Sequence, residues 1–238
     1  MSLSQIKSKI KSFESTKKVT KAMRNIASVK ITILKHRILL VNSNVLHLKE
    51  NIGELNNKEM DNKISIVFSP KKGMCGGLSR RILADLTSDS TADSKFGGNS
   101  VIVGVELPVS KLLSEFGYTV ESCFIDLEDD NYPVLSLFNS IKEKLNTTVE
   151  LFFVSIANNQ LTLQSIQINL DGTNTSKVVL YSYLEYAYLH TRLTEEQKRV
   201  EAMQLASDNC DKLLTINKTK YFKLRQAKIT QEILEISN

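Results

Sequence analysis

The sequence is short of the residues that interrupt helices. It has nine glycines and three prolines among 238 residues, and all of them lie between Gly53 and Gly172. Residues 1–52 and 173–238 contain neither. Because glycine and proline are the strongest interruptions of a helix, this distribution predicts two long helices on either side of a conventional domain.

Residues that build catalytic and metal sites are scarce as well. The three cysteines have no CxxC spacing, which argues against a disulfide framework and against a zinc site. No run of about 18 or more apolar residues occurs, so no membrane span is expected. HExxH and GxSxG motifs are missing. The sequence therefore predicts no catalytic residue, metal or cofactor. The histidines are His36, His47 and His190.

Apolar residues in both terminal segments recur mostly at steps of three, four or seven, which is typical of a helix. Ser2 with Gln5 resembles a capping box at the first helix, and Thr194 with Gln197 gives a weaker capping signal within the second. A helix of about 50 residues would be roughly 75 Å long, which suggests a coiled coil. The first stripe is Ile6, Ile10, Phe13, Val19, Met23, Ile26, Ile33, Leu40, Val45, Leu48, Ile52 and Leu55. The second is Leu189, Leu193, Val200, Met203, Ala206, Cys210, Leu213, Leu214, Tyr221, Leu224, Ala227, Ile233 and Ile236.

Neither terminal helix can bury its stripe alone, so we expect the two to wind around each other. The chain passes through a compact domain between them, which makes the pairing antiparallel. Cys210 falls on the second stripe and is interpreted as a core residue, because free cysteine is usually buried.

The central segment alternates between strand and helix patterns. This alternation predicts an open, mainly parallel α/β sheet. The fold class is thus α/β with a long antiparallel coiled coil, divided into residues 1–58, 59–175 and 176–238. Strands are expected at 63–69, 99–105, 118–125, 149–156 and 161–170, with a turn at Asn158-Asn159. Helices are expected at 77–86, at 110–116 with Gly117 as its stop, and at 133–145.

Positive charge is concentrated in the first helix. Residues 1–58 hold 12 Lys or Arg and 3 Glu, a net charge of +9 against +5 for the whole chain. Such a helix can meet nucleic acid, an anionic membrane or acidic protein surfaces, or can be a solvated face of a coiled coil. Single-stranded nucleic-acid binding favours aromatics among the basic residues. Phe13 is the only aromatic in the first 60 residues, so no nucleic-acid partner is expected.

Residues 71–78 follow a predicted strand and precede a predicted helix, where a phosphate loop could lie. The order GxxxxGK[ST] is missing, and no Ser or Thr follows a lysine to hold magnesium. Adjacent glycines at a helix start more often allow a tight turn, and this interpretation is favoured. The start of a helix can lower the pKa of a cysteine such as Cys75, but no His or Asp is near it in the sequence to support a role as a nucleophile.

Four segments carry a resemblance to a known family. Residues 17–30 resemble the N-terminal signature of the gamma subunit of F-type ATP synthases, and residues 73–78 (GMCGGL) look like its motif after the first strand. Residues 198–209 match the start of its C-terminal helix, and residues 224–236 are close to its C-terminal signature. All four occur in family order. They cover the terminal segments well and the centre loosely.

The resemblance implies a non-catalytic rotor subunit of the central stalk, coupling proton flow to ATP synthesis. Its paired helices would stand inside a ring of three catalytic beta and three non-catalytic alpha subunits, and its α/β domain would meet the epsilon subunit and the membrane c-ring. Rotation would drive each catalytic site in turn through conformations that bind nucleotide weakly, at intermediate strength and tightly. By the same resemblance, the chain would be peripheral to the cytoplasmic face of a bacterial inner membrane.

The resemblance also implies contact residues. Arg225 and Gln226 would meet an acidic loop of a catalytic subunit, with Lys21, Met23 and Arg24 on the nearby face of the other helix. The residues expected higher in the bearing are Gln231 and Glu232. A shaft that slips past its housing is expected to expose polar and basic residues rather than an apolar patch.

Two departures from the family pattern lie in the centre. Family members are usually some tens of residues longer, and Pro70-Lys71-Lys72 replaces the usual acidic-basic pair before the glycine motif. Two other functions stay open: a coiled-coil scaffold that does not rotate, and a small nucleotide-binding enzyme with helical arms. A scaffold would not require the family signatures at residues 17–30 and 224–236. An enzyme would require a phosphate loop.

Overall fold

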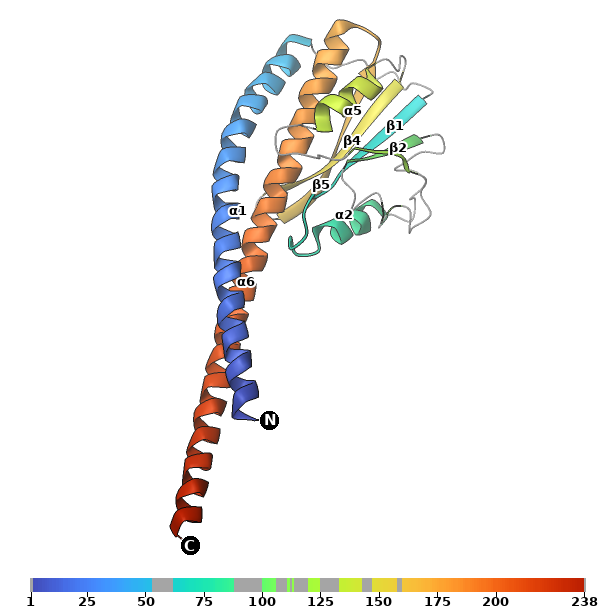
Figure 1. Ribbon diagram of the computed structural model, residues 1–238. Helices are drawn as coiled ribbons and strands as arrows, with labels where there is room; N and C mark the ends of the chain where they lie inside the picture. The colour runs from blue at the N-terminus through green and yellow to red at the C-terminus, as the bar shows by residue number, and fades with distance from the viewer. Residues whose placement is uncertain are drawn as a thin grey trace. The chain divides into compact units, whose positions relative to one another are not determined.

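The computed structural model describes residues 2–52, 62–87, 100–105, 111, 113, 120–124, 133–142, 147–157 and 160–237 (Figure 1). It forms two compact units. One comprises Met1–Val29 with Arg199–Asn238, and the other comprises Lys30–Lys198. The predicted boundaries at 58/59 and 175/176 stay a prediction.

The two terminal helices run through both units. Helix α1 spans Leu3–Ile52 and helix α6 spans Asn174–Ser237. The predicted capping box at the start of α1 is present, because the Ser2 amide donates to Gln5 Oε1 at 3.0 Å and the Gln5 amide donates to Ser2 Oγ at 3.3 Å. The prediction of long helices at both ends of the chain is confirmed.

The start of α6 differs from the weak signal at Thr194 and Gln197. Thr173 caps it, since the Ser176 amide donates to Thr173 Oγ1 at 3.2 Å. Thr194 lies well inside the helix, where its hydroxyl donates to the Val154 carbonyl at 3.2 Å. The capping interpretation of Thr194 was therefore wrong, because this side chain joins α6 to a strand instead.

The sheet in the second unit has five strands in the order β3-β2-β1-β4-β5. Its first four strands are parallel to one another, which confirms the mainly parallel arrangement. β5 pairs antiparallel with β4, with Ala157 opposite Gln160. The predicted turn at Asn158-Asn159 lies outside the described residues. The strands are β1 Asn62–Phe68, β2 Ser100–Val105, β3 Val120–Phe124, β4 Thr147–Ala157 and β5 Gln160–Leu170.

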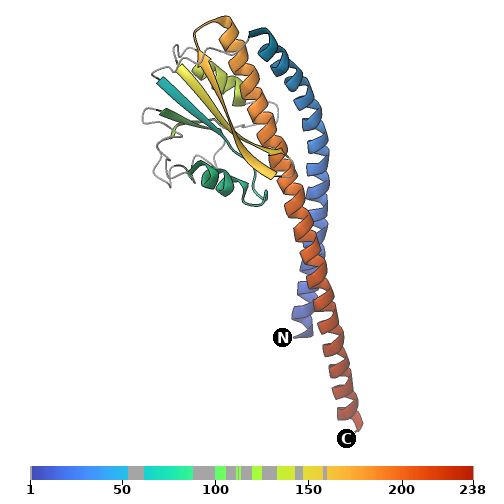
Figure 2. The ribbon, with the colours of Figure 1, turned by 180° about the vertical axis from the view of Figure 1, so that it is seen from behind.

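Helices cover both faces of this sheet. On one face, Ile64, Ile66 and Phe68 of β1 pack in a cluster with residues of α5 and with the parts of α1 and α6 that belong to this unit. On the other, Val67 packs with Leu78 and Ile82 of α2. Alternate β1 side chains thus face opposite layers, as the period of a strand requires. Figures 1 and 2 show the sheet between these layers from opposite sides.

The short helices lie close to their predicted ranges. α2 spans Leu78–Thr87, and α5 spans Pro133–Ile141, with Pro133 at its first position. In the segment predicted as a helix at 110–116, the structure describes Lys111 and Leu113, and both have helical backbone. Gly117, its predicted stop, lies outside the described residues.

Candidate interaction surface of the terminal helices

In the first unit, α1 lies side by side with α6, and the last turns of α6 extend beyond the N-terminus of α1 (Figures 1 and 2). Apart from Met23, the buried and half-buried residues of α1 here recur at alternating steps of three and four, which is the heptad pattern of a coiled coil. Ile6 and Ala27 are the most deeply buried, at 2% and 1% exposed. The series is Leu3, Ile6, Ile10, Phe13, Lys17, Thr20, Arg24 and Ala27.

The opposing seam on α6 is formed by Met203, Cys210 and Leu214, all buried. The burial of Cys210 agrees with its predicted core role. Cross-helix contacts give the direction of the pairing: Glu14 meets Lys218 at 3.4 Å, Lys17 meets Asp211 at 2.5 Å, and Arg24 bonds Gln204. Since the α6 number falls as the α1 number rises, the helices are antiparallel, as predicted.

The middle of this seam is polar. Lys17, Thr20 and Arg24 occupy three successive core positions of α1. The Thr20 hydroxyl donates to the Lys17 carbonyl at 3.0 Å, and the other two side chains pair across to α6. Polar groups at core positions of a coiled coil favour the one register in which they find partners. This layer therefore selects the alignment of the two helices more than it adds stability.

The predicted apolar stripe of α1 needs correction. Val19 and Ile26 are 54% and 59% exposed in the first unit, and Ile33 and Leu40 are similarly exposed in the second. These residues follow a seven-residue spacing of their own, on a face other than the paired seam. The helix has apolar residues on more than one face, so spacing alone could not identify the seam. The exposed face also contradicts the expectation of a mainly polar surface.

The last turns of α6 expose apolar side chains too. Tyr221 is the last half-buried residue, and every described residue after it is exposed. The predicted seam positions Leu224, Ala227, Ile233 and Ile236 are therefore on the surface and not in the seam. Contiguous exposed apolar residues mark interaction sites in soluble proteins. The exposed large apolar residues after Tyr221 are Phe222, Leu224, Ile229, Ile233, Leu234 and Ile236. Of these, Phe222, Ile229, Ile233 and Ile236 recur at steps of seven, four and three on one side of the helix, which is called the terminal face here.

The structure distributes the predicted contact residues over the first unit. Lys21 is exposed, whereas Met23 and Arg24 are half-buried. Arg225 and Gln226 are exposed on the terminal face of α6. Gln231 and Glu232 are also exposed, and both pair within the helix, Gln231 with Glu235 at 2.9 Å and Glu232 with Lys228 at 3.6 Å. Their contact roles stay a prediction.

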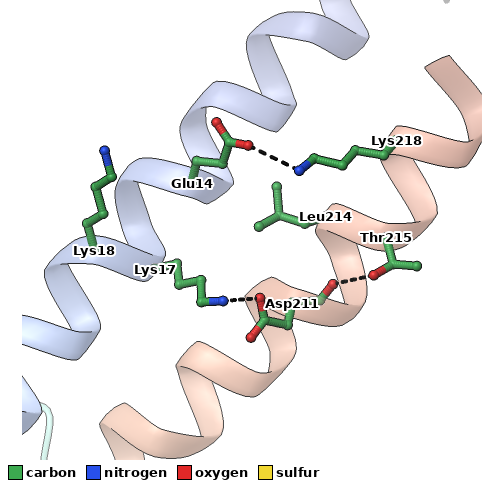
Figure 3. Close-up of a pocket in the computed structure, with 7 residues that line it drawn as sticks. All are labelled: Glu14, Lys17, Lys18, Asp211, Leu214, Thr215 and Lys218. Atoms are coloured by element: carbon green, nitrogen blue, oxygen red, sulfur yellow. Dashed lines mark hydrogen bonds and ion pairs between the residues drawn. The ribbon is translucent and has the colours of Figure 1, made fainter. Parts of the chain in front are cut away.

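A charged hollow of about 500 Å³ lies between the paired helices (Figure 3). Its ion pairs, Glu14 with Lys218 and Lys17 with Asp211, cross from one helix to the other, while Lys18 points away from them. The four paired side chains are 39–52% exposed. The lysine and carboxylate charges largely satisfy each other, so the hollow is a feature of the pairing rather than a ligand site. It is lined by Glu14, Lys17, Lys18, Asp211, Leu214, Thr215 and Lys218.

The glycine loop in the second unit forms a tight turn. Gly76 and Gly77 have left-handed backbone, with φ of 65° and 74°, a conformation in which glycine carries no steric penalty. The amides of Lys71 and Lys72 both donate to the carboxylate of Glu195 at 3.0 Å. In a phosphate loop such amides would face the anion. The loop geometry therefore favours the tight-turn interpretation, and Glu195 is a residue that the sequence analysis missed.

The ring of His190 packs against two aromatic rings. Its ring lies 4.3 Å from that of Tyr186 and 6.2 Å from that of Phe153. Burial lowers the pKa of His190, as expected for a cation in an apolar setting. Among the described residues, no group of three or more His, Cys, Asp or Glu could hold a metal ion. None of the described helices is long and apolar enough to cross a membrane.

A family model described as ATP synthase matches residues 2–171 and 172–238. The chain belongs to the ATP synthase family. Its curated relatives include the ATP synthase gamma chains of Clostridium beijerinckii, at 27% identity over 98% of this chain and 95% of the relative, and of Paracidovorax citrulli, at 26% over 98% and 96%. The gamma chain of Rickettsia canadensis is 23% identical over 98% and 96%. The resemblance to gamma subunits is thus confirmed over nearly the whole chain.

Solved ATP synthase structures share the fold of this family member. A chain in the rotor of the Euglena gracilis mitochondrial ATP synthase matches with a TM-score of 0.75 at 10% identity, over 95% of this chain and 98% of that one. A chain of the Tetrahymena thermophila mitochondrial central stalk and c-ring matches with a TM-score of 0.60 at 16% identity, over 79% and 99%. The α/β fold with long terminal helices is therefore that of ATP synthase central-stalk chains.

Proposed function

We propose that this chain is the rotor subunit in the central stalk of a proton-translocating ATP synthase, where it couples proton flow through the membrane sector to ATP synthesis in the catalytic head. The observation that carries the proposal is the exposed apolar face of α6 after Tyr221. Every described residue of this segment is exposed, so its apolar side chains are available to a surrounding partner.

The paired helices suit a shaft mechanically. Antiparallel helices joined by a heptad seam bend less than either helix alone, and the polar layer at Lys17 and Arg24 opposes sliding because a shift would break the contacts to Asp211 and Gln204. A partner can shift a conformational equilibrium only by contacting its states differently. A rotating shaft whose faces differ in their side chains would contact each catalytic site differently at each angle, and so would favour a different conformation of that site.

The proposed partners are the alpha and beta subunits of the head, the epsilon subunit and the c-ring, with one copy of this chain per complex. The proposed head contacts are Lys21, Met23, Arg24, Arg225, Gln226, Gln231 and Glu232. Exposed Arg225 suits an acidic loop, because an arginine can bind a carboxylate through two hydrogen bonds.

In this proposal the chain carries no catalytic group, and the chemistry of ATP belongs to the head. The complex would hold it at the cytoplasmic face of a bacterial inner membrane as a peripheral subunit. Gamma chains from several bacteria among its relatives support this location.

The proposal is tested by purifying the tagged chain from its native membranes and identifying the chains that come with it. Recovery of alpha and beta subunits is expected, and their absence would overturn the proposal. ATP-driven proton pumping by the purified complex in vesicles then tests coupling. Deletion of residues 224–238 should lower pumping or assembly without removing a catalytic group.

A further control distinguishes a rotor from a fixed scaffold. A reversible disulfide engineered between this chain and one beta subunit should stop ATP turnover, and reduction should restore it. Unchanged turnover with the crosslink intact would favour a scaffold that does not rotate.

A further inference from the structure

The loop of residues 69–77, between β1 and α2, is held by one carboxylate of α6. Glu195 is 1% exposed, and its two oxygens accept hydrogen bonds from the Lys71 and Lys72 amides, each at 3.0 Å. One side chain thus binds two successive backbone donors of the loop. Hydrogen bonds to an ionised acceptor are stronger than those between neutral groups.

Glu195 is itself held in place by its own helix. Arg192 Nη1 donates to Glu195 Oε2 at 2.8 Å, and Arg192 Nε donates to the Tyr188 hydroxyl at 3.1 Å. The guanidinium also lies over the Tyr188 ring, at 5.2 Å from its centre. A buried carboxylate needs such a partner, because an unpaired buried charge is strongly unfavourable. Burial acts to lower the pKa of Arg192, but Tyr188 and Glu195 raise it overall.

The loop conformation that Glu195 holds is a strained one. Met74 has a φ of 63°, a left-handed conformation that costs free energy for a residue with a Cβ. Its side chain is 63% exposed, whereas the next residue, Cys75, is 6% exposed, and the Cys75 thiol donates to the Lys72 carbonyl at 3.5 Å. The strained turn therefore places a large apolar side chain outward and a thiol inward.

We propose that Glu195 is the positioning residue of the 69–77 loop, and that its carboxylate holds the strained turn that presents Met74 to solvent and shields Cys75. The loop then keeps one conformation relative to this part of α6. Without the carboxylate, the two amides lose their acceptor and the strain at Met74 favours other turns. The inference does not depend on the proposed function, because it concerns contacts within the second unit.

Native-state alkylation tests the proposal on the full-length chain. The chain is treated with N-ethylmaleimide, and the labelling rate of each cysteine is read from its peptide by mass spectrometry. Glu195→Ala should raise the rate at Cys75 by roughly tenfold, because loss of the two loop bonds increases local opening. The rate at Cys210, which is buried in the first unit, should not change.

Two variants make the readout specific. Glu195→Gln keeps an acceptor oxygen but loses the charge, so its Cys75 rate should lie between those of the parent chain and Glu195→Ala. Glu185→Gln makes the same chemical change at a half-buried glutamate elsewhere on α6 and should leave Cys75 at the parent rate. Met74→Gly in the Glu195→Ala background should restore part of the protection, since glycine accepts left-handed backbone without the steric cost.

The labelling rates of Cys75 and Cys210 together distinguish a local role of Glu195 from a general one. A selective rise at Cys75, graded from Gln to Ala, supports the proposal. An equal rise at Cys75 and Cys210 with a lower melting temperature would show a general structural role and would overturn it. An unchanged Cys75 rate in both Glu195 variants would overturn it as well.

Discussion

Lys17 of α1 and Asp211 of α6 are 194 positions apart in the sequence, yet their charged groups meet at 2.5 Å between the paired helices (Figure 3). Lys17 occupies a core position of the heptad seam, where an apolar residue is the rule. The pair therefore helps to select the register of the helices at a small gain in stability.

We expect Asp211→Ala to destabilise the chain by about 0.2–1 kcal/mol, because both side chains are more than a third exposed and solvent screens their attraction. The measurement is urea unfolding of the isolated chain at low and high salt, and the difference should shrink at high salt. The exchanged pair, Lys17→Asp with Asp211→Lys, should recover most of the loss. If the exchanged pair recovers none of the lost stability, the ion pair itself does not contribute to the free energy of unfolding.

Leu214 provides the opposite case, since it is an apolar seam residue that is 8% exposed. Leu214→Ala should cost about 2–5 kcal/mol, because it removes buried methyl groups and leaves a cavity. Its matched control is Leu205→Ala on the same helix, where the side chain is 65% exposed, and the change there should stay within about 0.5 kcal/mol. Equal effects at the two positions in urea unfolding would contradict the assigned seam.

The turn before α6 contains a carboxyl group with a shifted pKa. The Asp171 pKa falls from 3.8 to about 2, chiefly because the Thr173 side chain donates to it, at 2.7 Å. A depressed folded-state pKa contributes stability that is present above pH 3.8 and is lost as the pH falls toward about 2. NMR titration of the Asp171 carboxyl should therefore give a pKa well below that of a model aspartate.

Thr173→Ala should move that pKa back toward 3.8, since it removes the strongest donor. Thr219→Ala is the control, because the Thr219 hydroxyl donates to the Thr215 carbonyl within the helix at 3.0 Å. A Thr173→Ala titration identical to that of the parent would contradict the assigned cause.

The terminal face of α6 should matter for binding and not for folding. The variant replaces Phe222, Ile229, Ile233 and Ile236 together by alanine. Alanine is a good helix former, so the change removes only exposed apolar area. The melting temperature of the isolated chain should stay nearly unchanged, while recovery of ATPase head subunits in a pull-down should fall at least about tenfold.

The matched control for this change replaces four exposed polar residues of the same segment by alanine. These are Lys223, Thr230, Glu235 and Ser237, none of which is a proposed contact. This variant should retain most of the head binding. If the polar set reduces recovery more than the apolar set, the apolar face is not the main contact.

The sequence located the helices well, because their limits follow from local chemistry. Ser2 and Gln5 form the predicted capping box at the start of α1. The seam of α1 was only partly predicted. Ile6 is buried as expected, whereas Val19 and Ile26 are exposed, and Lys17 and Arg24 occupy core positions instead. A helix with apolar residues on more than one face does not reveal which face its partner will cover.

Glu195 shows the same limit in the candidate loop. In the sequence it is an acidic residue of a long helix, 123 positions from Lys72, and no spacing rule connects the two. The one local hint is that Lys71 and Lys72 follow a strand and precede glycines, so their amides need acceptors in a tight turn.

By itself, the sequence determined the helix lengths, the strand order along the chain and the family signatures, since these depend on breakers, periodicity and motifs that neighbouring residues carry. Only the tertiary structure decided which helix face is paired, which apolar side chains remain exposed after Tyr221, and that Glu195 binds the glycine loop. These features depend on contacts between residues distant in sequence, and such contacts exist only once the chain has brought those residues together.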